Sequence, residues 1–124
     1  MNDKRQQRAF AEFVLEQMAG IPGIGMRAMF GGFGISRDGL MFALVADEQL
    51  YFKANDRLAD DFTALGLQPL RYDSKGKTVS LGYYQAPESV FEESEQMRLW
   101  ADKAHQCALR TAMSKYRKPT RRKT

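Results

Sequence analysis

The chain has 124 residues, of which 44% are hydrophobic and 27% are charged, and its formal net charge is +4. This length and composition indicate one globular domain with a single hydrophobic core. They exclude a membrane span, because no run approaches the roughly 18 apolar residues that a span needs, and the N-terminus lacks the apolar core of a signal peptide. The single cysteine, Cys107, cannot form an intramolecular disulfide, which fits a reducing compartment. We therefore expect a cytoplasmic protein.

The positive charge is concentrated near the C-terminus. Six of the 19 lysines and arginines lie between residues 115 and 123, where no acidic residue occurs, and the other 13 are set against 15 acidic residues. The six are Lys115, Arg117, Lys118, Arg121, Arg122 and Lys123. Pro119 interrupts this stretch, and after Tyr116 it holds no large apolar residue that could anchor it. We predict one domain over residues 1–114 and a basic, disordered tail over residues 115–124.

The N-terminal segment predicts an amphipathic helix. Phe10, Phe13, Val14 and Met18 recur at helical spacing, and charged residues occupy other positions around the helix. Because glycine commonly terminates helices, we expect this one to end near Gly20.

The following segment, residues 20–25, holds Pro22 and three glycines and therefore excludes a continued helix. Residues 21–28 resemble the turn of a helix-hairpin-helix element, which presents backbone N–H groups to a DNA phosphate. Such an element needs a second helix directly after the turn, and the glycines and aromatics that follow disfavour one. We expect a loop that leads into a strand.

Three antiparallel strands are predicted next. Residues 27–35 and 40–46 are apolar or glycine with little charge, and Asp38–Gly39 between them supplies the chemistry of a hairpin turn. Residues 50–54 alternate in polarity and predict a third strand. The three strands form a meander.

A short helix and further strands are predicted after residue 54. Asn55 or Asp56 can act as the N-cap, and Gly66 can end the helix. Its apolar face holds Leu58, Phe62 and Leu65. Residues 70–85 predict one or two more strands around a turn at residues 73–77.

Two more helices are predicted at the end of the domain. Pro87 suits the first turn of a short helix through Phe91, and Ser94 can cap a longer one. The apolar stripe of the longer helix holds Met97, Trp100, Ala101, Ala104, Ala108 and Thr111. The order of elements indicates an α+β fold, with a mostly antiparallel sheet, an N-terminal helix, a short central helix and a long C-terminal helix.

Residues 29–44 contain four glycines among apolar residues, which raises the question of phosphate or base binding. Gly31, Gly32 and Gly34 lack the G-x-G-x-x-G spacing of a dinucleotide-binding loop, and a strand follows them instead of a helix. Residues 32–35 overlap the RNP1 pattern of RNA-binding sheets, but Gly31 and Ile35 replace its basic residue and its second aromatic. We interpret the three glycines as strand positions that a neighbouring backbone or a bulky side chain approaches closely, or where the strand bulges.

Candidate catalytic and metal-binding residues are few. His105 is the only histidine, and on a helix it points about 200° away from Cys107, so we expect no Cys–His dyad. We predict helix packing for Cys107 and partial exposure for His105. Asp56, Asp60 and Asp61 could line a cation site, but a solvated helix face is the favoured interpretation. We predict no catalytic residue, no metal site and no cofactor.

Three tyrosines on the predicted strands allow two interpretations. Tyr51, Tyr83 and Tyr84 could form an exposed aromatic platform for a binding partner. Edge or half-buried strand positions explain the same residues equally well. Both interpretations remain open from the sequence.

The glycine-rich stretch also carries a family resemblance. Its signature residues are Met29, Phe30, Gly31, Gly32, Phe33, Gly34, Asp38 and Gly39. The segment YFKAND at residues 51–56, the pair Tyr83–Tyr84 shortly before Pro87 and the helix around Trp100 support it. Over residues 10–112, the chain resembles the N-terminal domain of the TfoX (Sxy) family of competence regulators.

The resemblance implies a non-enzymatic role and an α+β domain with an antiparallel sheet. Full-length members of the family are linked to DNA uptake and act as coactivators that help the cyclic-AMP receptor protein at particular promoters. The resemblance therefore implies protein partners in the transcription machinery, and it supplies no catalytic residue to transfer. Two-domain members carry a second, helical C-terminal domain, whereas a basic tail follows residue 114 here.

A second hypothesis assigns nucleic-acid binding to the basic tail. Six cations on a flexible segment can displace counterions from DNA in a salt-dependent and sequence-independent way. A solubilising terminus is the alternative explanation of the same charges, and both remain open. An enzymatic function ranks last, because the only histidine lies on a predicted helix without an evident partner.

Overall fold

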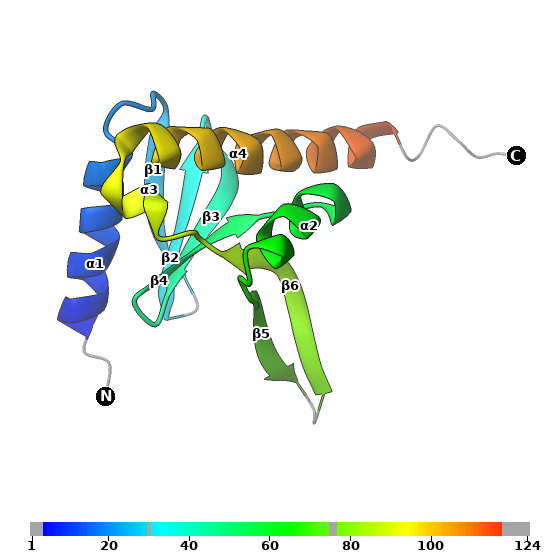
Figure 1. The fold of residues 1–124 in the computed structure, drawn as a ribbon, viewed down its shortest axis with the longest axis horizontal. Helices are drawn as coiled ribbons and strands as arrows, with labels where there is room; N and C mark the ends of the chain where they lie inside the picture. Colours follow the sequence, from blue (N-terminus) through cyan, green and yellow to red (C-terminus); the bar gives the residue numbers. More distant parts are fainter. Residues whose placement is uncertain (1–3, 30, 75–76, 118–124) are drawn as a thin grey trace, which may run out of the picture.

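In a computed structural model, residues 4–29, 31–74 and 77–117 are described, and they fold around one antiparallel sheet (Figure 1). In chain order the elements are α1 (Lys4–Gln17), β1 (Ile24–Met29), β2 (Gly32–Arg37), β3 (Leu40–Ala46), β4 (Gln49–Lys53), α2 (Asp56–Ala64), β5 (Pro69–Ser74), β6 (Lys77–Gln85), α3 (Ser89–Glu92) and α4 (Ser94–Arg117). The six strands have the order β1-β2-β3-β4-β6-β5, and every neighbouring pair is antiparallel. The predicted α+β class is confirmed.

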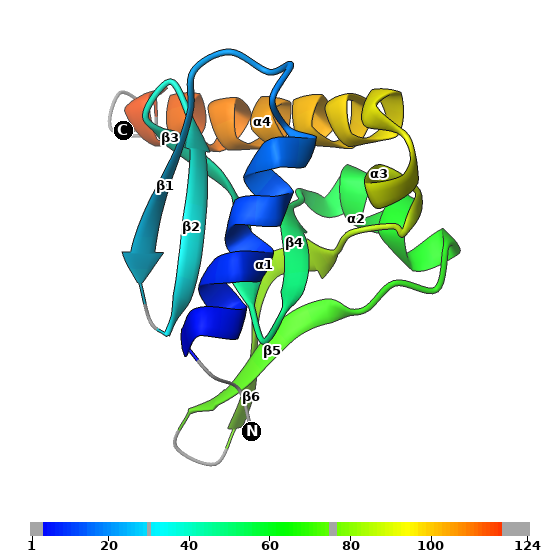
Figure 2. The same ribbon diagram turned by 90° about the vertical axis from the view of Figure 1, so that its left-hand side faces the viewer.

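The helices pack on one face of the sheet. Cross-strand partners share a face, and the row on the covered face consists of Met26, Ile35, Ala43, Phe52 and Tyr84. Val14 of α1 and Met97 and Ala104 of α4 are fully buried in the same core cluster as this row. Figure 2 shows α1 running alongside the strands and α4 crossing behind them. Within the described residues, no helix combines the length and the apolar character needed to cross a bilayer.

The opposite face of the sheet is more open. Its corresponding row consists of Arg27, Gly34, Leu44, Tyr51 and Gln85. Arg27 is exposed, Leu44 and Tyr51 are half-buried, and Gly34 is the buried member of the row. One face therefore builds the core, whereas the other leaves side chains within reach of solvent.

The prediction of a single strand over residues 27–35 is wrong. This run contains the end of β1, a turn and the start of β2, and Gly31 lies in the turn with φ of 77°. Glycine adopts this left-handed conformation at little cost, so it can reverse the chain without the usual polar turn residues. The apolar run is unbroken in sequence, which is why its periodicity does not reveal the reversal. Phe30 itself lies outside the described residues.

The β2–β3 and β3–β4 turns share a common geometry. Asp38 and Gly39 connect β2 to β3 with φ of 53° and 83°, which confirms the predicted turn. Asp47 and Glu48 connect β3 to β4 with φ of 51° and 58°. Two successive positive φ values match the twist of antiparallel strands and are typical of two-residue hairpin loops.

Three residues predicted on the apolar faces of helices are exposed, and Phe13 of α1 is one of them, at 40%. Leu65 is 58% exposed because it is the C-cap of α2, one residue beyond the helix. Thr111 continues the buried stripe of α4, but it is exposed, as is its neighbour Ala112. The last buried residue of α4 is Ala108 among those whose side chains are described. The helix therefore extends beyond the core that its first half covers.

Candidate interaction surface

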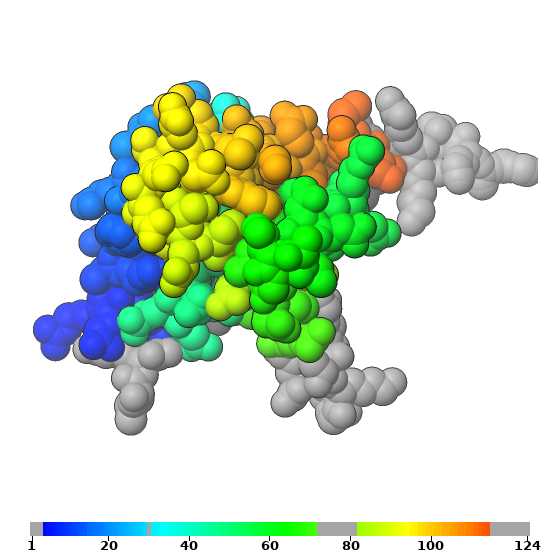
Figure 3. Space-filling model, viewed as in Figure 1, coloured from blue at the N-terminus to red at the C-terminus, as the bar shows by residue number. Residues whose placement is uncertain are grey.

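A groove of about 710 Å³ lies between α3, the β3–β4 turn and the C-terminal end of α2. It is lined by Phe10, Glu48, Gln49, Leu50, Leu65, Leu67, Gln85, Ala86, Pro87, Glu88, Ser89 and Phe91. On the face shown in Figure 3, α3 in yellow, the β3–β4 turn in blue-green and α2 in green surround this region. Four separate segments of the chain therefore contribute to one concave surface.

The groove combines an apolar lining with acidic residues. Seven of its twelve described lining residues are apolar, and Leu65 is 58% exposed in its wall. Glu48 and Glu88 are exposed, whereas none of the described lining residues is lysine or arginine. Gln85 Nε2 donates a hydrogen bond to Gln49 Oε1 at 3.0 Å and ties β6 to β4 here. We call this surface the acidic-rimmed groove.

An aromatic cluster extends the apolar surface beyond the groove. Phe10 and Phe91 line the groove, with ring centroids 6.0 Å apart. Phe13 lies 6.3 Å from Phe10 and 5.7 Å from Phe91, and its ring is stacked on that of Phe91. Phe13 is 40% exposed, although a phenylalanine gains most by burial. Exposed aromatics beside a groove are typical anchors of protein interfaces.

These features suit the binding of a partner segment. The described lining residues include no histidine, cysteine or lysine. Among the described residues, no group of three or more histidine, cysteine, aspartate or glutamate side chains could hold a metal ion. An apolar surface edged by carboxylates can take a segment that carries both apolar and basic side chains.

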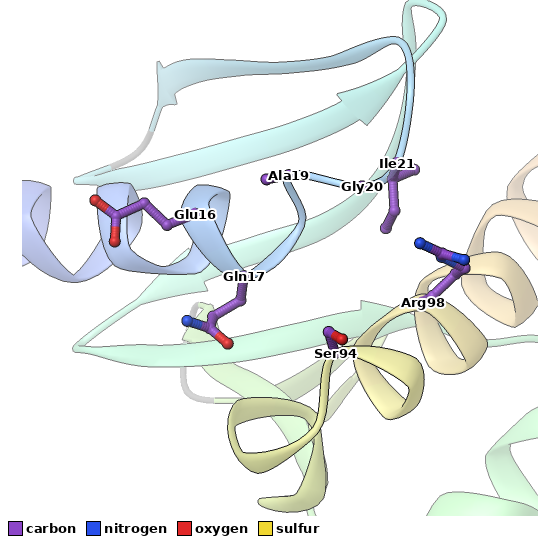
Figure 4. Close-up of a pocket in the computed structure, with 7 residues that line it drawn as sticks. All are labelled: Glu16, Gln17, Ala19, Gly20, Ile21, Ser94 and Arg98. Atoms are coloured by element: carbon purple, nitrogen blue, oxygen red, sulfur yellow. The ribbon is translucent and has the colours of Figure 1, made fainter.

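A smaller hollow of about 190 Å³ lies between the end of α1 and the start of α4 (Figure 4). Glu16 lines it from α1, and Ser94 and Arg98 line it from α4. The Arg98 guanidinium lies over Gly20, where a Cβ atom would be 2.7 Å from Nη2. Because Arg98 is exposed, solvent competes with any ligand at its guanidinium, and this hollow is a weaker candidate than the groove.

A third hollow, of about 270 Å³, lies on the open face of the sheet. Arg27, Met29, Ser36 and Met41 line it around Gly34. The sulfurs of Met29 and Met41 would lie 2.6 and 2.7 Å from a Cβ atom on Gly34, so both side chains occupy the space that glycine leaves. We interpret this contact as packing on the sheet.

The structure separates the roles of the three signature glycines. Gly32 lies where the backbone of Val45 approaches, and Gly34 lies beneath two methionine side chains. Both positions agree with the close approach expected from the sequence. Gly31 was expected in a strand, and this expectation is wrong because it lies in the β1–β2 turn.

The residues considered for base stacking are largely covered. Phe33, the aromatic of the RNP1-like stretch, is 8% exposed, and the Arg8 guanidinium of α1 lies 5.3 Å from its ring centroid. Tyr84 stacks on Phe62 with centroids 5.5 Å apart, on the covered face. Burial raises the pKa of Tyr83, which lies 5.3 Å from Lys53 Nζ on the other face. The three tyrosines therefore form no common platform, because Tyr84 faces away from the other two.

The pKa of Tyr51 is also raised, first by burial and then by the negative charge of Asp47. Burial and the nearby negative charge both favour the neutral phenol, so Tyr51 keeps its proton to higher pH than a free tyrosine. The half-buried strand position proposed for Tyr51 is confirmed.

The predicted packing of Cys107 is confirmed, since it is buried as a free thiol. The prediction of partial exposure for His105 is wrong, because it is 9% exposed and meets the Phe42 ring edge-on at 6.1 Å. The bulge between Ile35 and Ser36 brings Phe42 onto the covered face, which the sequence does not show. Asp56, Asp60 and Asp61 are exposed, in agreement with a solvated helix face.

The basic tail falls mostly outside the described residues. The backbone of α4 continues to Arg117, but the side chains of Lys115 and Arg117 are not described. Lys118, Arg121, Arg122 and Lys123 lie wholly outside the described residues. The predicted boundary at residue 114 and the predicted nucleic-acid contacts stay predictions.

Sequence patterns did not identify the groove. Its residues come from α1, the β3–β4 hairpin, the end of α2, β6 and α3, and no local spacing relates them. The sequence analysis placed Phe13 on the apolar face of its helix together with Phe10, so it did not reveal that Phe13 is 40% exposed beside the groove.

Comparisons with known proteins agree with the resemblance. Residues 16–108 match the family described as TfoX N-terminal domain. The chain is 32% identical to Protein Sxy of Escherichia coli over 76 residues, which are 61% of this chain and 36% of that protein. It is 31% identical to DNA transformation protein TfoX1 of Aliivibrio fischeri over 67 residues, which are 54% of this chain and 32% of that protein. The matched part spans about a third of these curated relatives, and the chain belongs to the TfoX N-terminal domain family.

Proposed function

We propose that this chain is a non-enzymatic regulatory domain of the competence-regulator kind and that it acts through protein contacts at the acidic-rimmed groove. Its family membership, together with the name of a DNA transformation protein among its relatives, supports this class of function. The observation that carries the proposal is the groove itself, which joins apolar walls, exposed carboxylates and an exposed aromatic cluster. The proposed partner is a component of the transcription machinery, and the proposed effect is coactivation in the cytoplasm.

A transcription and DNA-uptake assay tests the proposal. A host that lacks the gene is complemented with the wild-type chain, with Leu65→Glu and with Leu99→Glu. Leu65 lies in the groove wall, whereas Leu99 is an exposed leucine of α4, and they are 58% and 45% exposed. We expect Leu65→Glu to lower reporter transcription and transformation frequency at least tenfold, because it replaces an apolar contact in the groove wall with a charge that partner binding would bury.

Leu99→Glu is the matched control, and it should retain wild-type levels of both. Protein abundance must be equal in the three strains, so that lost signal reports lost binding. If the wild-type chain restores neither readout, or if Leu65→Glu restores both fully, the proposal is wrong. Promoter occupancy by a bound regulator, with and without the chain, then shows whether coactivation is the mechanism.

A second candidate function is nucleic-acid binding through the basic tail. Six lysines and arginines within nine residues favour it. If all six contact phosphates, the logarithm of the affinity should fall with the logarithm of salt concentration with a slope of about five. Truncation after Ser114 should abolish this binding, measured by fluorescence anisotropy with labelled duplex DNA. Unchanged affinity in the truncated chain would exclude the tail.

A further inference from the structure

The C-terminal part of α4 extends beyond the hydrophobic core. Ala104 and Ala108 are 0% and 2% exposed, whereas Thr111 and Ala112 continue the same helical stripe and are exposed. Every residue from Leu109 to Ser114 is exposed. A helix loses burial on its inward side only where its packing partner ends. We call residues 109–117 the α4 overhang.

The α4 overhang is apolar and basic. Leu109 and Met113 are one helical turn apart and are 37% and 54% exposed. Arg110, Lys115 and Arg117 belong to the same segment, which contains no acidic residue. A surface that covers these apolar side chains would remove them from water and so favour association.

The acidic-rimmed groove has the complementary properties. Leu65, Leu67 and Phe91 supply accessible apolar contacts, and Glu48 and Glu88 supply opposite charge. The groove can therefore contact the apolar side chains of the α4 overhang and attract its basic ones.

The two surfaces of one molecule cannot meet each other. The groove adjoins α3, just before α4 begins at Ser94, and the α4 overhang begins fifteen residues later. At 1.5 Å per helical residue this separation is about 22 Å along a continuous helix. Figure 1 shows α3 and the end of α4 at opposite ends of that helix. A contact between them requires two molecules.

We propose that the α4 overhang of one copy docks in the acidic-rimmed groove of a second copy. The two contacting surfaces differ, so the association is head-to-tail and each added copy offers a new free groove and a new free α4 overhang. The inference rests on the proposed function only because both use the acidic-rimmed groove. Self-association would therefore compete with the binding of another partner to this groove.

Sedimentation of the purified full chain over about 1 µM to 1 mM tests the association. The weight-average mass should rise with concentration beyond twice the 14.1 kDa protomer mass. Higher salt should shift this rise to higher concentrations, because charge contributes to the contact. Leu65→Glu in the groove and Met113→Glu in the α4 overhang should each weaken association about thirtyfold or more.

Mixing the two variants gives the decisive result. Leu65→Glu retains an intact α4 overhang and Met113→Glu retains an intact groove, so the mixture should form heterodimers and stop there. A misfolded variant could not restore binding in this way. Leu99→Glu, in the same helix outside the α4 overhang, should associate like the wild type.

Three outcomes would overturn the proposal: a monomeric wild type at all concentrations, no heterodimer in the mixture, or equal loss of association in Leu99→Glu. Each leaves the proposed function standing, because that function is read by transcription. Conversely, Met113→Glu should support wild-type or higher transcription if the proposed function holds, because it frees the groove without altering it.

Discussion

The carbonyl oxygen of Val45 in β3 occupies the space that a Cβ atom on Gly32 of β2 would take. Two strands are therefore close enough at this point that only glycine fits. We predict that Gly32→Ala lowers the free energy of unfolding by about 3 kcal/mol, because the obstacle is backbone that can move only with the sheet. Urea unfolding followed by circular dichroism measures the loss.

Gly34→Ala is the matched comparison. Its added methyl group would meet the sulfurs of Met29 and Met41, which are ends of flexible side chains. These can move toward solvent on the open face, so we expect a cost of about 1 kcal/mol or less. Equal losses in the two variants would contradict the distinction between backbone and side-chain contact.

Gly32 and Gly34 also show which features of this region the sequence could predict. Spacing and context excluded a phosphate loop and indicated close approach at Gly32 and Gly34, and the structure agrees. The same apolar run did not reveal the turn at Gly31, because this turn contains none of the polar residues that usually indicate a turn in a sequence. Local chemistry thus predicted the crowded positions, whereas the chain reversal depended on pairing between β1 and β2.

Asn55 begins α2 as its N-cap. Its side-chain oxygen accepts a hydrogen bond from the backbone N–H of Leu58 at 2.9 Å. We predict that Asn55→Ala lowers the free energy of unfolding by about 1 kcal/mol, because this N–H group loses its partner. Asn55→Asp keeps an acceptor and should remain close to the wild type. Thermal unfolding of the three proteins checks the order, and a stable alanine variant would show that solvent replaces the cap.

Tyr83 links stability to alkaline pH. Burial raises its pKa above the ordinary tyrosine value of roughly 10. The unfolded chain therefore releases this proton at a lower pH than the folded chain does. Its contribution is fully present below about pH 10, and the free energy of unfolding falls as the pH rises above that value.

Tyr83→Phe removes this linkage. We expect its free energy of unfolding to fall less steeply than that of the wild type between about pH 9 and pH 11. The two proteins differ only in the Tyr83 hydroxyl, so the difference between their slopes reports its ionisation. Urea titrations at a series of pH values measure the two slopes, and parallel curves would show that Tyr83 ionises alike in both states.

The acidic-rimmed groove could not be predicted from the sequence, because its lining residues come from elements that are distant along the chain. A backbone hydrogen bond of 2.8 Å from the Ala86 N–H to the Leu50 carbonyl oxygen brings these two residues together. Phe10 reaches Phe91 across a sequence separation that includes the whole sheet. Periodicity assigns each residue to its own helix or strand, but contacts between elements decide which of them share a surface.

Phe62 and Phe13 allow the effects of a substitution on stability and on partner binding to be distinguished. Phe62 is fully buried, stacks on Tyr84 at 5.5 Å and lies 5.0 Å from Trp100, whereas Phe13 is 40% exposed. We predict that Phe62→Ala costs about 3 to 5 kcal/mol of unfolding free energy, since it opens a cavity between α2, α4 and the sheet. Phe13→Ala should cost about 1 kcal/mol or less, because much of its ring already meets water.

The same two variants also test the surface. If the aromatic cluster helps to hold a partner beside the acidic-rimmed groove, Phe13→Ala should lower reporter transcription although its urea midpoint stays near that of the wild type. Phe62→Ala should lower transcription only together with protein abundance. A Phe13→Ala chain that is both stable and fully active would remove the cluster from the interface and confine the contact to the groove itself.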